Sequence, residues 1–200
     1  MIVIGLTGSI GSGKSEVSKM LGQLGAPIID ADRIGHQTYL PGSSAWHQLV
    51  EVFGEDIVKM SGEIDRKKLG TIVFEDPMAL EALNRIMHPI MQQVVKDNIE
   101  KYRKEMVELV VLEAALLIEA GWHTLVDEVW ITSSSKTEIL RRLRNNRGMT
   151  NSEVRNRMKS QMGSSIKEQY ATVIIDNSGT IDELRSQVQE IWSKRIKLKG

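Results

Sequence analysis

Residues 1–15 read MIVIGLTGSIGSGKS, an apolar run followed by a glycine-rich loop. The run from Ile2 to Leu6 is rich in β-branched residues and predicts a buried strand. The loop from Gly8 to Ser15 matches the phosphate-binding pattern GxxxxGK[ST] at every fixed position. Its glycines let successive backbone amides point at phosphate oxygens, and a helix beginning near Lys14 adds the positive end of its dipole. The opening therefore predicts a strand, a phosphate-binding loop and a helix.

Two side chains of this loop suit a nucleoside triphosphate. Lys14 supplies a mobile cation for the β- and γ-phosphates, and Ser15 supplies a hydroxyl for Mg²⁺, which bridges the same phosphates. The alternative is a glycine-rich turn with no ligand, which the strand and helix on either side disfavour. We therefore expect ATP with Mg²⁺ as the cofactor ion.

The rest of the chain predicts an α/β fold. Four more short apolar runs read as buried strands, with helical segments between them. Strands that alternate with helices form a parallel sheet, here of five strands flanked by helices. The four runs are Ala26 to Ile29, Leu109 to Leu112, Val129 to Thr132 and Val173 to Asp176.

Residues 31–108 are mostly helical in pattern and exceed what a simple crossover needs, so they should form a cap beside the sheet. One helix should start at Asp76-Pro77, where Asp can cap and Pro takes the first position. We expect Pro89 to end one helix and to open another. Three capping-box patterns predict further helix starts, at Ser135 to Glu138, Thr150 to Glu153 and Thr180 to Glu183.

Composition narrows the class of protein. The 200 residues are 41% hydrophobic and 26% charged, which predicts one compact folded unit and excludes a disordered chain. Lys plus Arg and Asp plus Glu are both 26, so no overall field attracts nucleic acid or an anionic membrane. There is no cysteine and no apolar run of 18 residues. We expect a soluble cytoplasmic protein with no nucleic-acid, membrane or obligate protein partner.

A nucleotide-binding chain of this size without the guanine-reading NKxD motif of GTP switches fits a small kinase, which needs a carboxylate for the acceptor hydroxyl. Asp30 and Asp32 end the second predicted strand, where open parallel sheets hold ligands. They share a face if the strand continues, so that one can accept the hydroxyl proton while the other contacts Mg²⁺ through water or caps a helix. Alternatively, both are turn-forming residues.

Other candidate residues lie later in the chain. Residues 141–159 hold seven basic residues and one acidic residue, the composition of a lid whose guanidinium groups cover phosphates. A solvated helix face is the plain alternative, and a nucleic-acid groove is disfavoured because no aromatic residue is interleaved. Glu113, after the third predicted strand, is a candidate for Mg²⁺ or a pocket-rim acid. His88 beside Pro89 is a site candidate or a structural histidine.

Five segments resemble the dephospho-coenzyme A kinases, a family of P-loop kinases, and the resemblance runs from Ile2 to Trp192. The phosphate loop is shared with many unrelated proteins, whereas the other segments in this order are specific. The segments are LTGSIGSGKS at 6–15, IIDADRIGHQ at 28–37, the stretch from Gly62 to Ile90 that ends in His-Pro-Ile, LLIE at 116–119 and VIIDNSG at 173–179.

The resemblance implies transfer of phosphate from ATP to the ribose 3′-hydroxyl of 3′-dephospho-coenzyme A, giving ADP and coenzyme A, the last step of coenzyme A synthesis. It also implies three parts. These are a nucleotide-binding core of residues 1–31, 106–136 and 171–200, a helical acceptor domain of 32–105, and a lid of 137–170.

The resemblance also implies residue roles. Asp32 would be the base on the 3′-hydroxyl, while Lys14 and the lid residues Arg142 and Arg147 would act on the transferred phosphoryl group. Ser15 and Glu113 are the candidates for Mg²⁺. ATP would contact Gly8, Gly11, Ser12, Gly13, Lys14, Ser15, Glu16 and Asn177, and the acceptor would contact Thr7, Asp32, Arg33, Arg66 and His88.

Three positions depart from the family pattern. Glu16 stands where the family usually has a threonine whose hydroxyl reaches the α-phosphate; a carboxylate loses that bond but suits a helix N-terminus. Ser9 replaces a common glycine, and Ala115 replaces a common proline. Two other functions remain open from the residues alone: a P-loop kinase for another small molecule or nucleotide, and a nucleotide-gated nucleic-acid-binding protein that uses residues 141–159.

Overall fold

The computed structural model of the chain describes residues 1–147 and 161–197, with side chains for 1–143 and 161–195. The chain divides into two compact units. The first combines residues 1–30 with the chain from Ile99 onward, and the second is Ala31–Asn98. The second unit covers most of the range 32–105 that the resemblance assigns to the acceptor.

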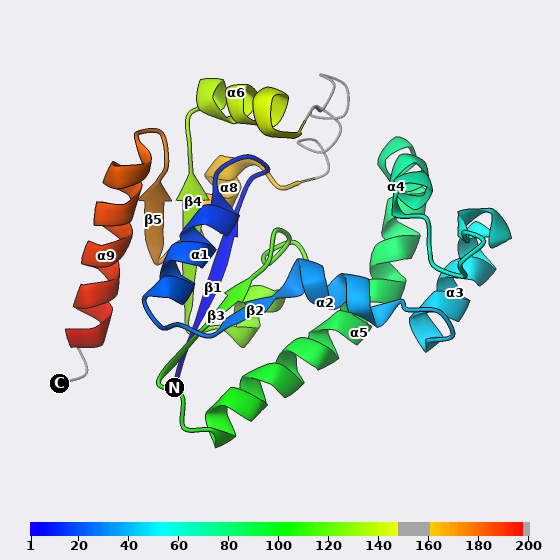
Figure 1. Ribbon diagram of the computed structural model, residues 1–200, viewed down its shortest axis with the longest axis horizontal. Coiled ribbons are helices and arrows are strands. Elements are labelled where there is room, and N and C mark those ends of the chain that lie inside the picture. Colours follow the sequence, from blue (N-terminus) through cyan, green and yellow to red (C-terminus); the bar gives the residue numbers. More distant parts are fainter. Residues whose placement is uncertain (148–160, 198–200) are drawn as a thin grey trace. The chain divides into compact units, whose positions relative to one another are not determined.

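The first unit is built on a five-stranded parallel sheet with the strand order β2-β3-β1-β4-β5 (Figure 1). This confirms the predicted fold class. β1 is central and almost wholly buried, as expected for a β-branched run covered on both faces. The strands are β1 (Ile2–Gly8), β2 (Ile28–Asp30), β3 (Leu109–Glu113), β4 (Glu128–Ser133) and β5 (Val173–Asp176).

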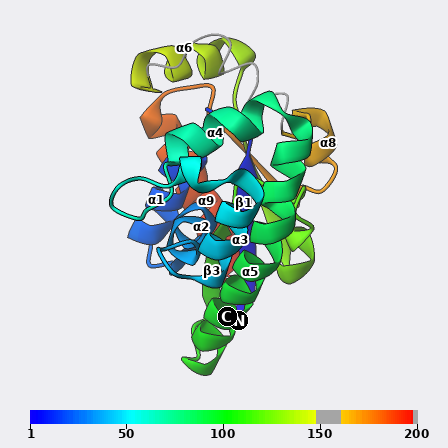
Figure 2. The ribbon, with the colours of Figure 1, turned by 90° about the vertical axis from the view of Figure 1, so that its right-hand side faces the viewer.

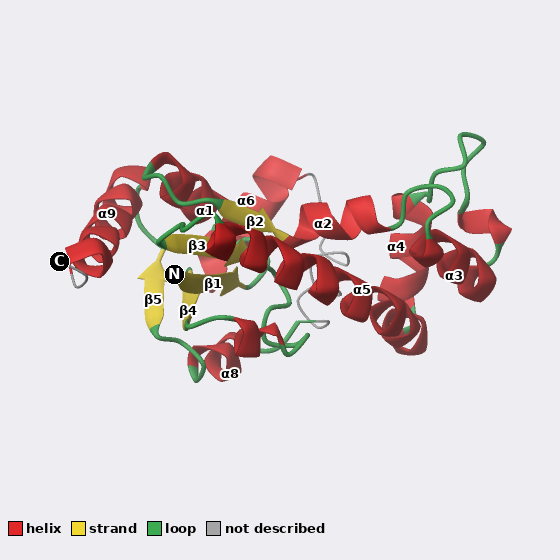
Figure 3. Cartoon of the chain, turned by 90° about the horizontal axis from the view of Figure 1, so that it is seen from below, coloured by secondary structure: helices red, strands yellow, loops and turns green. Residues whose placement is uncertain are grey.

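Helices cover both faces of this sheet. Helices α1 (Lys14–Gln23) and α9 (Ile181–Lys197) lie on one face, and the short α8 (Ser164–Glu168) lies on the other (Figure 3). The first unit also contains helix α6 (Lys136–Arg147), the 3₁₀ helix η2 (Trp122–Leu125) and the C-terminal end of the long helix α5 (Pro77–Lys104). The core beneath α1 and α9 is aliphatic around one indole; its fully buried members include Ile4, Leu6, Val17, Leu21, Trp130, Ile175 and Val188.

The second unit is helical (Figure 2). It has its own apolar core. The core residues include Ala45, Leu49, Ile57, Ile64, Leu69, Val73 and Met87. The elements are α2 (Ala31–Thr38), α3 (Ser44–Phe53), η1 (Glu55–Ile57), α4 (Arg66–Glu75) and the greater part of α5 (Pro77–Lys104).

Pro89 does not end a helix as predicted. Helix α5 runs without interruption from Pro77 to Lys104 with Pro89 inside it. A proline in a helix interior loses one hydrogen bond and clashes with the preceding turn, at a cost of roughly 3 kcal/mol. Apolar residues on both sides of it, with Met87 and Val95 buried, face the same way at helical spacing. Their packing keeps the helix continuous, so tertiary contacts outweigh the local preference.

The predicted capping boxes have different outcomes. At the start of α9 the box is complete, since the Thr180 N–H donates to the Glu183 carboxylate at 2.7 Å and the Glu183 N–H donates to the Thr180 hydroxyl at 3.3 Å. Before α6 only half of the box forms, because the Glu138 N–H donates to Ser135 Oγ while the Glu138 carboxylate binds Arg141.

Within residues 1–147 and 161–197, no helix has the length and apolar character needed to cross a bilayer.

Candidate active site

The phosphate-binding loop joins the end of β1 to the start of α1, as the sequence predicts. Gly13 is the N-cap of α1 and has a left-handed backbone with φ 97°, which a side chain rarely adopts. A Cβ at Gly13 would also collide with the carboxamide of Asn177. Glycine at this position is therefore required both by the turn and by the residue packed against it.

The base of the loop is fixed by buried hydrogen bonds. The hydroxyl groups of Ser12 and Thr132 are 2.7 Å apart, and both residues are almost wholly buried. The carboxamide of Asn177 donates to the Ser12 carbonyl at 2.9 Å. Because Thr132 belongs to β4 and Asn177 follows β5, these bonds tie the loop to two strands on one side of β1. Buried polar groups paired in this way hold a unique geometry.

Lys14 and Ser15 converge on Glu113, the last residue of β3. The Lys14 ammonium lies 2.5 Å from Glu113 Oε1, and the Ser15 hydroxyl donates to the same oxygen at 3.1 Å. Burial alone would raise the pKa of Glu113, but the Lys14 charge and hydrogen bonds from Lys14, Ser18 and Ser15 bring that pKa below its ordinary value. Glu113 is therefore a carboxylate at neutral pH, as a metal ligand must be.

Asn177 and Arg142, which the sequence assigns to the nucleotide and to the lid, lie side by side. Arg142 on α6 donates from Nη2 to the Asn177 carbonyl at 2.7 Å, and its Nη1 is 3.4 Å from the Ser134 hydroxyl. Ser134 and Asn177 directly follow β4 and β5. The guanidinium group is thus held where these two strands end, beside the base of the phosphate loop.

Three other predicted site residues, Thr7, Gly8 and Glu16, lie on β1 and α1 of the first unit. Thr7 is fully buried, and its hydroxyl donates to the Ala115 carbonyl at 3.3 Å. Gly8 is the last residue of β1, and Glu16 lies in the first turn of α1. The side chain of Arg147 and the Thr150 to Glu153 capping box lie outside the described part of the chain.

Asp32 is on a helix rather than on a continued strand. β2 ends at Asp30 and α2 begins at Ala31, so the strand does not continue and the condition under which Asp30 and Asp32 would share one face is not met. Asp32 lies in the first turn of α2, where a carboxylate is favoured by the helix dipole. Asp32 and the neighbouring Arg33 are both exposed.

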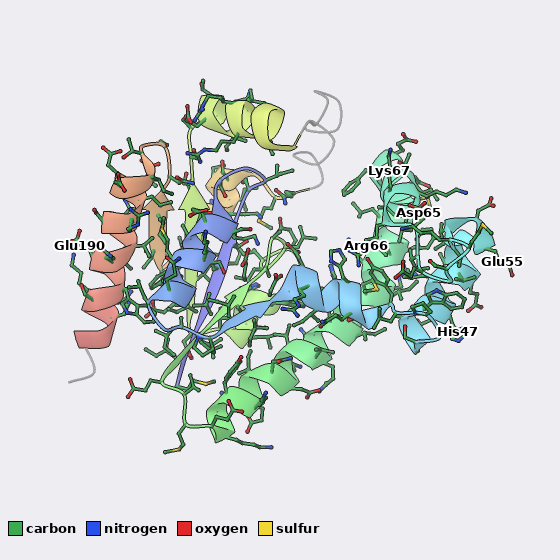
Figure 4. All side chains as sticks on the ribbon, viewed as in Figure 1. His47, Glu55, Asp65, Arg66, Lys67 and Glu190 are labelled. Atoms are coloured by element: carbon green, nitrogen blue, oxygen red, sulfur yellow. The ribbon has the colours of Figure 1, made fainter. Side chains whose placement is uncertain are left out.

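The other acceptor candidates belong to the second unit. Arg66 is the exposed first residue of α4, directly after Asp65, whose carboxylate caps that helix (Figure 4). His88 is half-buried in α5, and burial lowers its pKa. The sequence analysis gave no place to Tyr39, whose pKa is raised by burial, an effect that the nearby positive charge of Arg66 opposes. A tyrosine near a candidate acceptor arginine leaves no local pattern in the sequence.

These residues belong to a chain with many relatives. The family model described as dephospho-CoA kinase matches residues 2–183. The chain belongs to the dephospho-CoA kinase family. A dephospho-CoA kinase from Dehalococcoides mccartyi is 40% identical over 198 residues, covering 99% of this chain and all of the relative. One from Geobacter sulfurreducens is 43% identical over 196 residues, covering 98% and 100%.

A solved structure has the same architecture. A crystal structure of a protein from Thermus thermophilus superposes with a TM-score of 0.79 at 30% identity, covering 96% of this chain and 97% of that one. The membership applies to the chain as a whole, because the family model includes the phosphate loop, the helical unit and the Asn177 segment alike.

Replacing Glu113 should remove a pH-dependent part of the stability. Its pKa is lower in the folded protein than the ordinary value of 4.5, so its contribution is complete above about pH 4.5 and is lost as the pH falls below that. We expect Glu113→Gln to destabilise the protein by about 2 kcal/mol at pH 7, the size of a charge-assisted hydrogen bond, and by much less at pH 3. Urea unfolding at the two pH values measures this difference.

The control is Glu81→Gln, which removes an exposed carboxylate that pairs with Arg85. An exposed ion pair contributes little, so this variant should resemble the wild type at both pH values. A Glu113→Gln penalty of the same size at pH 3 as at pH 7 would contradict the assignment of a depressed pKa.

Proposed function

We propose that the protein transfers the γ-phosphoryl group of ATP to the ribose 3′-hydroxyl of dephospho-coenzyme A, giving coenzyme A and ADP. This is the last step of coenzyme A biosynthesis. The proposal rests on one observation in this member of the family: Lys14 and Ser15 of the phosphate loop converge on the Glu113 carboxylate. The cytoplasmic location stays a prediction from the sequence.

The phosphates of ATP lie along the loop from Gly8 to Glu16, where glycines and the α1 N-terminus favour anions. Lys14, paired with Glu113 in the protein alone, moves its charge onto the β- and γ-phosphates. Phosphoryl transfer involves little covalent work by the protein, so this neutralisation and the positioning of the two substrates supply most of the rate.

The oxygens of Ser15 and Glu113 fit Mg²⁺. Mg²⁺ prefers oxygen ligands and keeps several waters, so it needs one or two protein groups beside the phosphates. Within the described residues, no group of three or more His, Cys, Asp or Glu side chains could hold a metal ion, and a hydroxyl with a single carboxylate suits this mode of binding. Held there by Ser15 and Glu113, Mg²⁺ would supply positive charge that neutralises the phosphates.

Arg142 and Asn177 form the adenine side of the ATP site in this proposal. The guanidinium plane is held by the Asn177 carbonyl, with Ser134 nearby, which leaves a planar cation suited to stacking on a base. This role differs from the one expected from the sequence, in which Arg142 covers the transferred phosphoryl group. Its short contact with the residue after β5 supports the adenine side.

Asp32 is the proposed general base. Its carboxylate is exposed in the first turn of α2, two residues after β2 ends, and can accept the proton of the 3′-hydroxyl. Arg33, Arg66 and His88 are the proposed contacts of the acceptor. Dephospho-coenzyme A carries phosphate groups, for which exposed guanidinium groups are suitable partners.

An ADP-release assay with ATP and Mg²⁺ tests the function directly. It compares 3′-dephospho-coenzyme A with AMP, gluconate and no acceptor, and mass spectrometry identifies the product. We expect stimulation by dephospho-coenzyme A alone, with a product of coenzyme A mass. Stimulation by another acceptor would keep the kinase mechanism and discard this substrate. No stimulation, with salt-dependent binding to an oligonucleotide, would favour a nucleic-acid-binding protein.

Asp32→Asn should lower kcat roughly 10²- to 10⁴-fold, the range for loss of a general base, while the Kd for ATP changes less than about twofold. Asp97→Asn, at an exposed position of α5, is the control and should keep its activity. Steady-state kinetics and a separate ATP-binding titration measure the two effects. A kcat near that of the wild type would remove Asp32 as the base.

Arg142→Ala distinguishes the two roles of that residue. Loss of a cation stacked on adenine should raise the KM for ATP by about 5- to 30-fold, corresponding to about 1–2 kcal/mol, with kcat nearly unchanged. The neighbouring Arg141, which is exposed and pairs with Glu138, provides the control Arg141→Ala. A large fall in kcat at unchanged KM would instead return Arg142 to the transferred phosphoryl group.

A further inference from the structure

Ile10, at the tip of the phosphate loop, is contacted by two segments that are far from it in the sequence. Its side chain packs against Ile139 and Leu143 of α6. Its backbone N–H donates to the carboxamide oxygen of Gln161 at 2.9 Å. The adjoining Gly11 is tightly surrounded as well, since a Cβ there would lie 3.1 Å from both α6 side chains. The tip is therefore packed on one side and hydrogen-bonded on another.

The residues that follow Gln161 are fixed to the loop after β3 by hydrogen bonds and an ion pair around Glu119. We call this network of Glu119, Met162 and Lys167 the brace. The N–H of the next residue, Met162, donates to Glu119 Oε1 at 3.0 Å. The same oxygen lies 2.9 Å from the ammonium of Lys167, which also donates to the Ala115 carbonyl at 3.0 Å. A charge is buried at low cost only when it is paired and hydrogen-bonded, and Lys167 is 1% exposed.

This brace gives a structural role to the LLIE segment at 116–119, which ends in Glu119. One carboxylate receives hydrogen-bond donors from both ends of residues 162–167, so that stretch has a fixed position on the core. Gln161 extends from it to the loop tip. Among the contacts described above, those from Thr132 and Asn177 act on Ser12, and that from Glu113 acts on Lys14 and Ser15. The tip at Ile10 is contacted instead by Gln161 and α6.

We propose that Gln161 is a positioning residue for ATP. By accepting the Ile10 N–H, it holds the loop tip so that the amides of the following residues are already oriented for phosphate oxygens. Preorganised donors bind without the cost of ordering the loop, so the contact acts on ATP affinity rather than on the acceptor. The inference deepens the proposed function and rests on it for the identity of the reaction.

Gln161→Met tests the contact, because methionine has a similar length but only a weak acceptor. In protein labelled with ¹⁵N-isoleucine, hydrogen exchange of the Ile10 amide should become roughly 2- to 10-fold faster, as expected for loss of one hydrogen bond. The KM for ATP should rise by a similar factor, while kcat and the KM for dephospho-coenzyme A stay within about twofold. Gln169→Met, an exposed position of the same segment, is the matched control.

Gln161→Glu keeps an acceptor oxygen and should keep slow exchange of the Ile10 amide, which separates the hydrogen bond from general packing. Unchanged Ile10 exchange in folded Gln161→Met would overturn the proposal. An unchanged KM for ATP would also overturn it, because the contact would then have no effect on ATP binding. A lower KM would do so as well, because Gln161 would then compete with phosphate for the amide. The Kd for ATP, measured without an acceptor, tests the Gln161 contact whichever acceptor the protein uses. The identity of the acceptor is tested separately by the ADP-release assay.

Discussion

The site depends on one constraint: the chain leaving β1 must reverse within a few residues so that its amides face an anion. Glycine at position 13 makes the turn possible, but it does not hold the turn in place. That is done by the buried contacts of Ser12 with Thr132 on β4 and Asn177 after β5. The parallel sheet is therefore required by the site, because only its neighbouring strands bring these distant side chains to the end of β1.

The pairing of opposite charges at the site also follows from the order of strands in the sheet. β3 lies beside β1, so its last residue, Glu113, meets the Lys14 ammonium that the loop presents. A nearly buried lysine would be costly alone, and the Glu113 carboxylate neutralises it. In the proposed mechanism ATP takes over Lys14, which leaves Glu113 with the Ser15 hydroxyl, the oxygen pair proposed for Mg²⁺. A chain with no net charge thus concentrates opposite charges at this sheet edge.

The parts that the sequence predicted correctly are those with local causes. The strands are short β-branched runs, the phosphate loop has fixed spacing, and the box at Thr180 needs only residues three apart. The error at Pro89 has a non-local cause, because apolar packing on either side keeps this residue within α5. The arrangement of Asp30 and Asp32 depended on where β2 ends, which the sequence left open; β2 stops at Asp30, and Asp32 lies on α2.

Contacts that set the loop could not be predicted in this way, since they join residues without a shared pattern. Ile10 and Gln161 are 151 positions apart, and Ser12 and Asn177 are 165 apart. A glycine-rich turn and a phosphate site have the same local sequence, so the motif alone leaves both open. What separates them is whether the rest of the fold uses buried polar groups to fix the turn in one geometry. Here it does so at the base of the loop and at its tip, which favours a preformed anion site over a flexible turn.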